Sequence, residues 1–298
     1  MKIIGIDSEK CIQCEECVKD CSHHLYFTRD SSETTGEQFK IGFEDPDDRC
    51  ILCGHCLAVC PTNAVITEGL EESYEFEEAK DPNKIINYEN LMKMIRSRRS
   101  IRRFEEKPLP KAHIEKILQA MRYAPSASNA QDWNYVVITD PEKIQYLNSK
   151  VMRIFYLLKK VLKIKHLIRP IVSGEAKRLL LAPGTKVSVQ QRIDSYEAGK
   201  DVIFFNAPCV VVLHSPKYGG MAGINAGIAL TQGIFAAQSL GIGSCWCGFA
   251  IEAIQRFRKL RKWLIPKGRK CYGVVAFGYP AIQFHRAPER KELQVLYL

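Results

Sequence analysis

The chain has 298 residues, of which 46% are hydrophobic, and its net charge is +10. This length has room for two domains with hydrophobic cores. No run of residues reaches the ~18 apolar residues that a membrane-spanning helix needs. The most apolar stretch, VIFFNAPCVVVLH, is interrupted by Asn206, Ala207 and Pro208, so we expect no transmembrane segment.

The charge is distributed unevenly along the chain. Residues 1–80 contain 7 Lys and Arg against 18 Asp and Glu, whereas the remaining residues contain 36 against 15. An acidic part followed by a basic part suggests that the two dock on each other, or that a basic face binds anionic partners. Because the basic residues are scattered and no recognition motif accompanies them, nucleic acid is not an expected partner.

Two cysteine runs of the same spacing stand near the N-terminus. CIQCEECVKDC and CILCGHCLAVC both follow the pattern Cys-x2-Cys-x2-Cys-x3-Cys. A zinc site usually takes two Cys-x2-Cys pairs, so the third cysteine of each run is surplus for zinc. It fits a cubane, and in the bacterial iron–sulfur spacing the fourth cysteine of each run binds the other cluster. One [4Fe–4S] cluster is therefore expected on Cys11, Cys14, Cys17 and Cys60, and a second on Cys50, Cys53, Cys56 and Cys21.

The two runs resemble those of the two-cluster bacterial ferredoxins, over about residues 1–68. Pro61 follows the second run as in that family, while Ser22 replaces the proline after the first. With its acidic linker, this first domain is assigned to residues 1–80. Such clusters are labile in oxidising surroundings, and the N-terminus MKIIGIDSEK lacks the apolar core of a secretory signal. A cytoplasmic location is the corresponding expectation.

Neither the segment between the cysteine runs nor the nearby histidines is predicted to bind a cluster. RDSSETTGEQ, between the cysteine runs, is polar and is expected to be a loop. Eight cysteines saturate two cubanes, so His23, His24 and His55 are interpreted as surface or loop histidines.

Helices and strands are predicted after the linker, in residues 84–298. Leu91, Met94 and Ile95 share one face of a helix over residues 88–98, and a second helix begins at Pro110 and ends before Pro125. NYVVITD, APCVVVLHS and CYGVVAFGYP are typical of buried strands. Further helices are expected around residues 225–240 and 251–263. The elements alternate without a regular βαβ rhythm, so the predicted fold class is α+β.

Three short segments of this second domain have the chemistry to bind a flat heterocycle that carries a phosphate. RSRRSIRRF offers guanidinium groups, which match the geometry of a phosphate. APSASNAQDW offers neutral hydrogen-bonding groups for the edge of a heterocycle. GIGSCWCGF lets the backbone approach a flat ligand closely, although it is no dinucleotide fingerprint because its glycine spacing differs.

In this order, the segments resemble the nitroreductase family of FMN enzymes. NAPCVVVLH and FGYP with the following RAPER add to the resemblance, while Asp132 replaces the usual proline before Trp133. The family implies an α+β sandwich that forms a homodimer with FMN at the interface. NAD(P)H or an external ferredoxin is the expected electron donor, and the ferredoxin would deliver its electrons through the clusters.

The resemblance assigns FMN contacts to several residues. Arg98 and Ser100 would hold the phosphate with their neighbour Arg99, and Arg102 would lie beside N1 and the C2 carbonyl of the ring. Ser126 and Ser128 would reach the FMN of the partner subunit. Asn129 and Gln131 would contact the pyrimidine edge or the ribityl chain, and the N–H groups of Cys247 and Gly248 would lie near N5 and O4. Either Arg286 or Arg290 would complete the phosphate site. No catalytic acid is assigned.

Two further features leave alternatives open. Cys209 and Cys271 are interpreted as core residues, and Cys245 and Cys247 as packing residues that could also be redox-active. Residues 143–174 contain eight Lys and Arg and no acid. We expect a half-buried helix there, with a lid over the flavin as the preferred functional interpretation; a membrane-surface helix or a dock for an acidic ferredoxin domain are alternatives.

The prediction as a whole is a flavin-dependent oxidoreductase that passes electrons through two [4Fe–4S] clusters and FMN. The acceptor would be an electron-poor small molecule such as a nitroaromatic or a quinone. The alternatives are a specialised biosynthetic or dehalogenating flavin enzyme, and a non-catalytic electron-transfer or redox-sensing module.

Overall fold

The computed structural model of the chain describes residues 1–29, 40–69, 74–168 and 174–298. It divides into two units, of which the first comprises Met1–Asn87 and Ser126–Ala130 and the second comprises Tyr88–Pro125 and Gln131–Leu298. Most of the predicted RDSSETTGEQ loop and part of the acidic linker lie outside the described residues. The described end of the linker forms two short 3-10 helices, η1 (Glu77–Lys80) and η2 (Pro82–Lys84).

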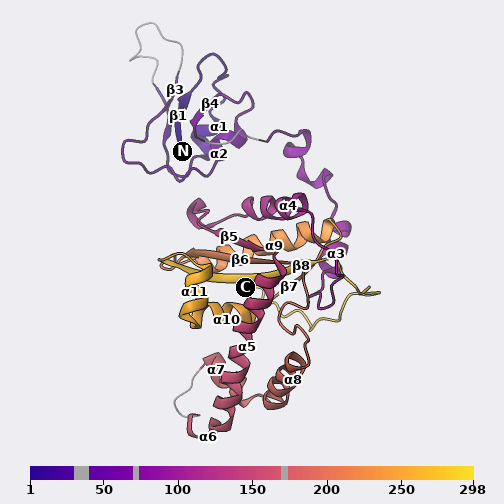
Figure 1. Cartoon of the computed structure of the whole chain (residues 1–298). Helices are drawn as coiled ribbons and strands as arrows, with labels where there is room; N and C mark the ends of the chain where they lie inside the picture. The colour runs from indigo at the N-terminus through magenta and orange to yellow at the C-terminus, as the bar shows by residue number, and fades with distance from the viewer. Residues whose placement is uncertain (30–39, 70–73, 169–173) are drawn as a thin grey trace. The chain divides into compact units, whose positions relative to one another are not determined.

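The first unit contains two small antiparallel sheets and two one-turn helices (Figure 1). β1 (Lys2–Ile6) pairs with β4 (Val65–Glu68), and β2 (Tyr26–Thr28) pairs with β3 (Ile41–Phe43). The helices α1 (Glu16–Asp20) and α2 (His55–Val59) each lie inside one of the cysteine runs. Three residues form the buried centre of this unit, namely Ile3, Tyr26 and Val65, and partly buried cysteines surround them. The cysteine loops are therefore a large part of its interior.

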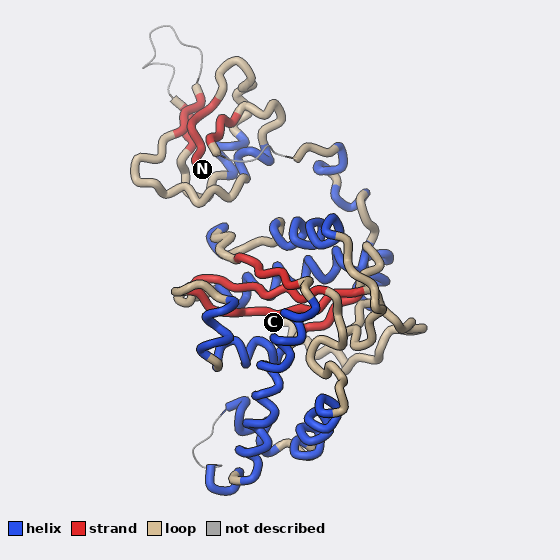
Figure 2. The backbone as a smooth tube through the Cα atoms, viewed as in Figure 1, coloured by secondary structure: helices blue, strands red, loops and turns tan. Residues whose placement is uncertain are grey.

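The second unit is built on a four-stranded antiparallel sheet with the order β5-β6-β8-β7 (Figure 2). Its strands are β5 (Asn134–Ile138), β6 (Cys209–Pro216), β7 (Gly243–Trp246) and β8 (Arg269–Gly278).

Side chains alternate between the two faces of the central strand β6, as the period of two in a strand requires. Val210 and Val212 enter one hydrophobic core, whereas Val211 and Leu213 enter the other. Both faces of the sheet are therefore buried, which explains why the sequence of β6 is apolar throughout.

Helices cover both faces of this sheet (Figure 1). On one face lie α4 (Lys111–Arg122) and α9 (Ala222–Ser239), whose buried residues belong to one core. On the other lie α5 (Pro141–Lys163), α10 (Gly248–Arg256) and α11 (Arg258–Leu264), with α8 (Thr185–Glu197) against α5. The remaining helices are α3 (Tyr88–Ser97), α6 (Lys165–Ile168) and α7 (Gly174–Leu181).

The predicted α+β class is confirmed. Helices and strands form where the sequence predicted them, with two differences. The prediction of a single helix around residues 251–263 is wrong, because Phe257 adopts an extended conformation (φ −91°, ψ 108°) and separates α10 from α11. No strand was predicted in GIGSCWCGF, and this segment contributes the edge strand β7.

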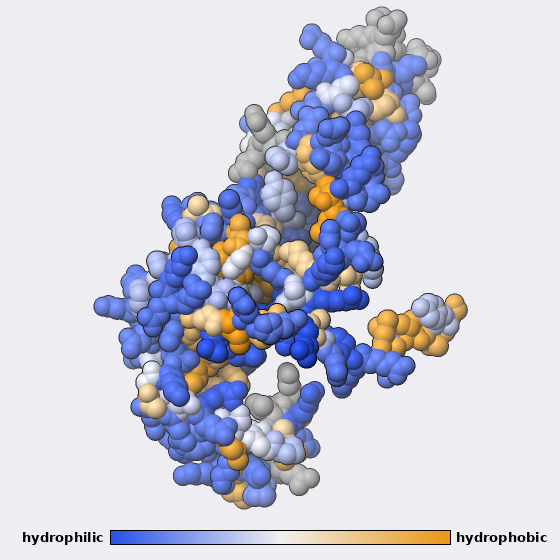
Figure 3. All heavy atoms as spheres, turned by 90° about the vertical axis from the view of Figure 1, so that its right-hand side faces the viewer, coloured by the Kyte–Doolittle hydropathy of each residue, from blue (hydrophilic) through white to orange (hydrophobic). Residues whose placement is uncertain are grey.

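The basic segment is largely the helix α5, with residues 169–173 outside the described part. Asp140 caps the helix by accepting hydrogen bonds from the N–H groups of Glu142 and Lys143. One face, including Leu147, Val151 and Phe155, is buried in the core. This is the half-buried helix that the sequence predicted. None of the helices in the described ranges combines the length and apolar character that crossing a bilayer requires. On the face drawn in Figure 3, hydrophilic residues predominate on the second unit and apolar ones lie in small patches.

A polar network ties the start of β5 to the centre of the sheet. Arg269 Nε donates to His214 Nδ1 (2.7 Å), and its Nη2 donates to His214 O (3.0 Å) and to the carbonyl oxygen of Asp132. His214 is buried, and burial followed by the charge of Arg269 lowers its pKa. The neutral imidazole can accept the guanidinium N–H, which the protonated ring cannot.

We expect His214 to make the protein less stable in mild acid. Its pKa is lower in the folded state than in the unfolded chain, so its contribution to stability is complete above about pH 6.5 and is lost as the pH falls through the folded-state pKa. His214→Gln keeps an acceptor for Arg269 but does not titrate. Its unfolding midpoint, measured by denaturant titration between pH 7 and 5, should fall less with pH than that of the wild type.

The exposed His285 provides the control for this experiment. His285→Gln should keep the wild-type pH profile. Identical profiles for His214→Gln and the wild type would contradict the assignment.

Candidate functional site

Each cysteine run is folded by left-handed residues at equivalent positions. Gln13 (φ 58°) and Glu15 (φ 62°) in the first run correspond to Leu52 (φ 51°) and Gly54 (φ 78°) in the second. A non-glycine residue in this conformation costs roughly 1–2 kcal/mol. The loops curl before α1 and α2 and bring successive thiols to one side, so the local strain has to be offset by interactions elsewhere.

The two loops enclose two hollows, and each hollow collects one of the predicted cysteine sets. One spans about 390 Å³, including space open to solvent, and its lining includes Cys21, Cys50, Cys53 and Cys56. The other spans about 330 Å³, measured in the same way, and its lining includes Cys11, Cys14, Cys17 and Cys60. In the described residues, no three His, Cys, Asp or Glu side chains converge as ligands of a single metal ion. The thiols stand around a space instead, an arrangement that suits a cluster.

Backbone N–H groups point at the last cysteine of each run. Leu25 N donates to Cys21 Sγ (3.5 Å), and at the equivalent position Ala64 N donates to Cys60 Sγ (3.2 Å). Burial tends to raise the pKa of Cys60, but the backbone donors, Ala64 first, lower it overall. Burial raises the pKa of Cys17 to about 11. Thiols in such surroundings need the positive charge of a bound metal to remain thiolates.

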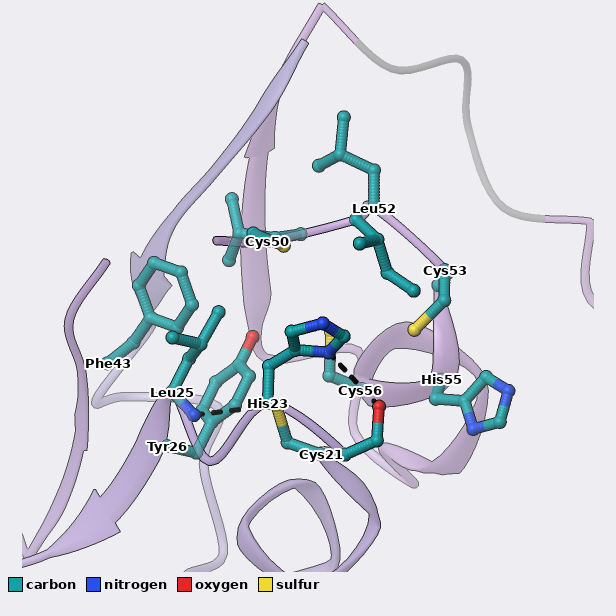
Figure 4. A pocket seen from close by; sticks show the side chains of 14 residues that line it. Cys21, His23, Leu25, Tyr26, Phe43, Cys50, Leu52, Cys53, His55 and Cys56 are labelled. Carbon is teal, nitrogen blue, oxygen red and sulfur yellow. Dashed lines mark hydrogen bonds between the residues drawn. The ribbon is translucent and has the colours of Figure 1, made fainter. Parts of the chain in front are cut away.

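Tyr26 supplies a hydroxyl donor beside the second set of cysteines. Its side chain is buried, its ring packs against Phe43 (4.9 Å between centroids), and the hydroxyl points into the hollow (Figure 4). Among the described residues the hydroxyl oxygen has no hydrogen-bond partner of good geometry. Burial, and then the neighbouring Cys56, raise its pKa. A buried donor aimed at this space fits a cluster whose sulfur atoms accept hydrogen bonds.

The histidines of this unit also have defined contacts. His55 Nδ1 lies 2.9 Å from Asp20 Oδ2, and His23 Nδ1 lies 3.2 Å from Ser22 Oγ. Both residues line the hollow that contains Cys50. In Figure 4 the His55 ring points away from the cysteines, whereas the His23 ring lies in front of Cys56.

In the second unit, the arginine segment runs along β7. Ile101 N donates to Ser244 O (2.9 Å), and Ser100 forms a parallel bridge with Ser244. This pairing brings Arg102, which follows Ile101, to the same edge of the sheet as Cys245, which follows Ser244. The structure therefore brings the predicted phosphate and ring contacts of the segment to the same sheet edge as Cys247 and Gly248.

The space beside Gly248 is open. A Cβ atom at this position would meet nothing within 4 Å, so a flat ligand could approach the backbone there. The N–H of Cys247, by contrast, donates to Val274 O (2.8 Å). Of the two N–H groups predicted to face the flavin, that of Gly248 is the better placed.

The chain after β8 returns to the arginine segment. Ala281 N donates to Arg103 O (2.9 Å), and the Arg99 guanidinium lies 5.5 Å from the centre of the Phe284 ring. Arg286 follows Phe284 by two residues, which places it near the segment predicted to hold a phosphate. Arg290 lies further along the exposed chain.

The predicted loop of polar residues has an unusual backbone. Ser128 (φ 50°), Asn129 (φ 48°) and Gln131 (φ 40°) are all left-handed. Within the first unit, Asn129 Nδ2 donates to the carbonyl oxygens of Ile51 (3.2 Å) and Leu52 (2.6 Å). The expected flavin contacts of this loop, Ser126 included, stay predictions. Such strained conformations concentrate at functional sites.

Asp201 was not identified from the sequence, and it fixes the turn before β6 that contacts Cys247. Asp201 accepts hydrogen bonds from the N–H groups of Ile203 and Phe204 (2.9 Å each) and Asn206 (3.1 Å). The Cys247 thiol donates to Ile203 O (3.4 Å). An Asp two residues before an apolar run was the available signal, since Asp side chains often cap such turns.

Comparison with known proteins identifies both parts of the chain. The nitroreductase family model matches residues 95–279. The chain belongs to the nitroreductase family. The 4Fe-4S dicluster domain model matches residues 10–64. A ferredoxin-type domain therefore precedes the nitroreductase domain in this chain, as its sequence predicted.

Relatives and solved structures agree with this assignment. A protein of Archaeoglobus fulgidus, provisionally named NADH dehydrogenase/NAD(P)H nitroreductase, is 29% identical over 68% of this chain and 93% of its own length. A nitroreductase with bound FMN from Bacteroides fragilis matches with a TM-score of 0.50 at 21% identity, over 70% of this chain and 98% of its own. One from Desulfitobacterium hafniense gives 0.51 at 22%, over 69% and 97%. These structures establish the shared fold.

Removing the Tyr26 hydroxyl should lower the reduction potential of the neighbouring cluster. A hydrogen bond to a cluster sulfur is stronger when the cluster carries its additional electron, so donors raise the potential. Tyr26→Phe should shift one of the two cluster potentials down by about 40 mV, equivalent to about 1 kcal/mol for one electron. The shift can be measured by redox titration followed by electron paramagnetic resonance.

Tyr135 offers a matched control. Its hydroxyl is also buried without a hydrogen-bond partner in the described chain, but it belongs to the other unit. Tyr135→Phe should leave both cluster potentials unchanged. A Tyr26→Phe protein with wild-type potentials would show that the hydroxyl makes no contact with the cluster.

Proposed function

We propose that the chain is an FMN-dependent reductase that receives electrons through its own two [4Fe–4S] clusters and delivers them to an electron-poor small molecule of the nitroaromatic or quinone type. The observation that carries the proposal is the presence, in one chain, of two cysteine-lined hollows and a nitroreductase fold with a basic segment along β7. Bound FMN would supply the exchange between one-electron and two-electron chemistry.

Residues of the second unit would hold and orient this FMN. Arg98, with Arg99 and Ser100 beside it, would bind the phosphate through charge-assisted hydrogen bonds, and Arg286 is better placed than Arg290 to complete that site. Arg102 would face N1 and the C2 carbonyl, where reduced flavin is anionic. The open space at Gly248 supports a flat ring at this edge of the sheet.

The electron donor is NAD(P)H or an external low-potential ferredoxin. The relatives named NADH dehydrogenase/NAD(P)H nitroreductase support the first, and the dicluster domain supports the second. We also propose a homodimer, as is common in this family. Exposed apolar residues that such a partner could cover include a group near the end of the chain, namely Leu293, Val295, Leu296, Tyr297 and Leu298.

An anaerobic reductive titration tests the proposal directly. NADH, NADPH and then reduced ferredoxin are added to the purified protein, while the flavin band and the broad iron–sulfur absorbance are followed together. Bleaching by a nicotinamide identifies hydride entry at the flavin, whereas bleaching by ferredoxin alone identifies the clusters as the entry port. A protein without a flavin band would refute the proposal.

A steady-state screen with nitro compounds and quinones then separates a reductase from an electron-transfer module. Turnover with either class of acceptor would support a reductase. If ferredoxin is the donor and Cys11→Ser or Cys50→Ser abolishes this turnover, electrons are delivered through the clusters. Full flavin and cluster reduction without turnover of any acceptor would favour the non-catalytic alternative.

Replacing Arg102 should make the flavin harder to reduce. A fixed cation beside N1 stabilises the anionic reduced ring, and the loss of about 1.4 kcal/mol of this interaction corresponds to about 30 mV for two electrons. Arg102→Met should therefore lower the flavin midpoint potential by about 30–60 mV, as measured by equilibration with reference dyes.

Arg103 is the control for this substitution, because it is the adjacent exposed arginine and only its backbone carbonyl is assigned a role. Arg103→Met should keep the wild-type potential. Equal shifts in both variants would indicate a general charge effect and remove Arg102 from the ring site.

A further inference from the structure

The arginine segment (residues 96–104) begins in a helix that has little packing of its own. α3 ends at Ser97, and none of its residues is buried in the described part of the chain. The last four carbonyl groups of a helix also lack partners within that helix. Contacts other than the hydrophobic core therefore have to fix this helix end, and with it Arg98 and Arg99, the next two residues.

The side chain of Gln238, near the end of α9, provides such contacts. Gln238 Nε2 donates to Met94 O (3.0 Å) and to Ser97 Oγ (2.6 Å). The Ser97 hydroxyl in turn donates to Met94 O (3.0 Å). The two hydrogen atoms of one amide group thus reach two acceptors in the last turn of α3. Gln238 therefore ties the end of α3 to α9.

The backbone of Gln238 is itself fixed by the turn that ends α9. Gly241, which is left-handed (φ 72°), donates its N–H to Gln238 O (3.0 Å). Ile242 N donates to Ala237 O (2.8 Å), and both of these residues are buried in the same core. Two such hydrogen bonds around a left-handed glycine are the Schellman motif, a common way for a helix to end. Gln238 therefore holds α3 from a rigid base.

The same turn leads into β7, which holds the arginine segment at a second point. Ile101 N donates to Ser244 O (2.9 Å), and Ser100 forms a bridge with Ser244. Gly243 leaves room for this pairing, because a Cβ atom there would lie 2.5 Å from Ile101 Cγ1. The side chain of Ile101 is therefore seated directly on the backbone of β7.

Arg98 and Arg99 are the residues between these two anchors, since Gln238 holds Ser97 and β7 holds Ser100. We propose that Gln238 is a positioning residue, which fixes the arginine segment in the conformation that binds the phosphate of FMN. The inference rests on the proposed function, which assigns the phosphate to this segment. A segment held at two points so close together loses little further conformational freedom when a phosphate binds, and the affinity is correspondingly higher.

The chemistry of the Gln238 side chain favours a directed role over a packing role. Its Oε1 atom is buried and has no hydrogen-bond partner in the described part of the chain. An unsatisfied buried acceptor destabilises the folded state, whereas a methionine of similar length would fill the same space without one. The two hydrogen bonds that Nε2 donates are what the amide adds.

A comparison of FMN with riboflavin, which lacks the phosphate, tests this inference. The full-length protein with its clusters intact is freed of flavin by anaerobic dialysis and titrated with either flavin, and the quenching of flavin fluorescence gives the dissociation constant. Gln238→Met should weaken FMN binding about five- to tenfold and change riboflavin binding by less than about twofold. Riboflavin is spared because Arg102, the proposed ring contact, follows the anchor at β7.

Gln255→Met is the matched control. Gln255 is also partly buried, and its Nε2 donates to Cys271 O (2.7 Å), so it joins α10 to β8 and not to the arginine segment. Its replacement should leave the ratio of FMN affinity to riboflavin affinity unchanged. Ser97→Ala is a second test at an exposed residue. It removes one of the two acceptors of Gln238 and should lower the same ratio by a smaller factor than Gln238→Met.

Arg98→Met separates this inference from the proposed function on which it rests. It should weaken FMN binding about tenfold or more, and adding Gln238→Met should then have little further effect, because both changes act on the same phosphate contact. A preference for FMN over riboflavin that Arg98→Met leaves unchanged would refute the proposed phosphate site. If Arg98→Met removes this preference but Gln238→Met keeps it, or weakens both flavins equally, Gln238 has no positioning role.

Discussion

The pairing of β6 with β8 is the constraint on which the second unit depends. These strands are buried on both faces, and their alternating side chains feed two separate cores, so neither strand can slip by one residue without exchanging the two sets. The pairing fixes where β7 lies, since β7 pairs only with β8 in the described sheet. The outer edge of β7 in turn takes up Ser100 and Ile101. The position of Arg102 is therefore a consequence of packing at the centre of the sheet.

The first unit is held by a different kind of interaction. Its buried centre contains few apolar residues, and four of the residues that fold the cysteine loops are left-handed. A domain of this size gains little from hydrophobic burial alone. Because the unfolded chain has no preformed site for the clusters, the free energy of cluster binding contributes directly to the free energy of folding. Cluster ligation can offset the strain at Gln13, Glu15 and Leu52. Structure and redox function in this unit share the same eight cysteines.

The parts of the molecule that could be predicted from sequence are those with a strong local or periodic signal. The cysteine spacing gave the two sets that the hollows bring together, and the apolar runs gave β5, β6 and β8. The break at Phe257 could not be predicted, because α10 and α11 together have a continuous helical pattern and only packing separates them. β7 is short and rich in glycine and cysteine, so its identity as a strand depends on β8. The contacts of Tyr26 with Phe43 and of Arg269 with Asp132 and His214 join residues distant in sequence, and no local pattern encodes them.

The two units differ in how they would handle charge, and this difference bears on the chemistry. The clusters change by one electron in an acidic unit, where hydrogen bonds from backbone N–H groups and from the Tyr26 hydroxyl would stabilise the added negative charge. The second unit is basic, and there the proposed contact of Arg102 would stabilise the anionic reduced ring. Reduction of a nitro group to an amine consumes more electrons than a flavin alone can hold. The flavin would therefore have to be refilled between successive two-electron steps, and two clusters in the same chain would supply those electrons one at a time.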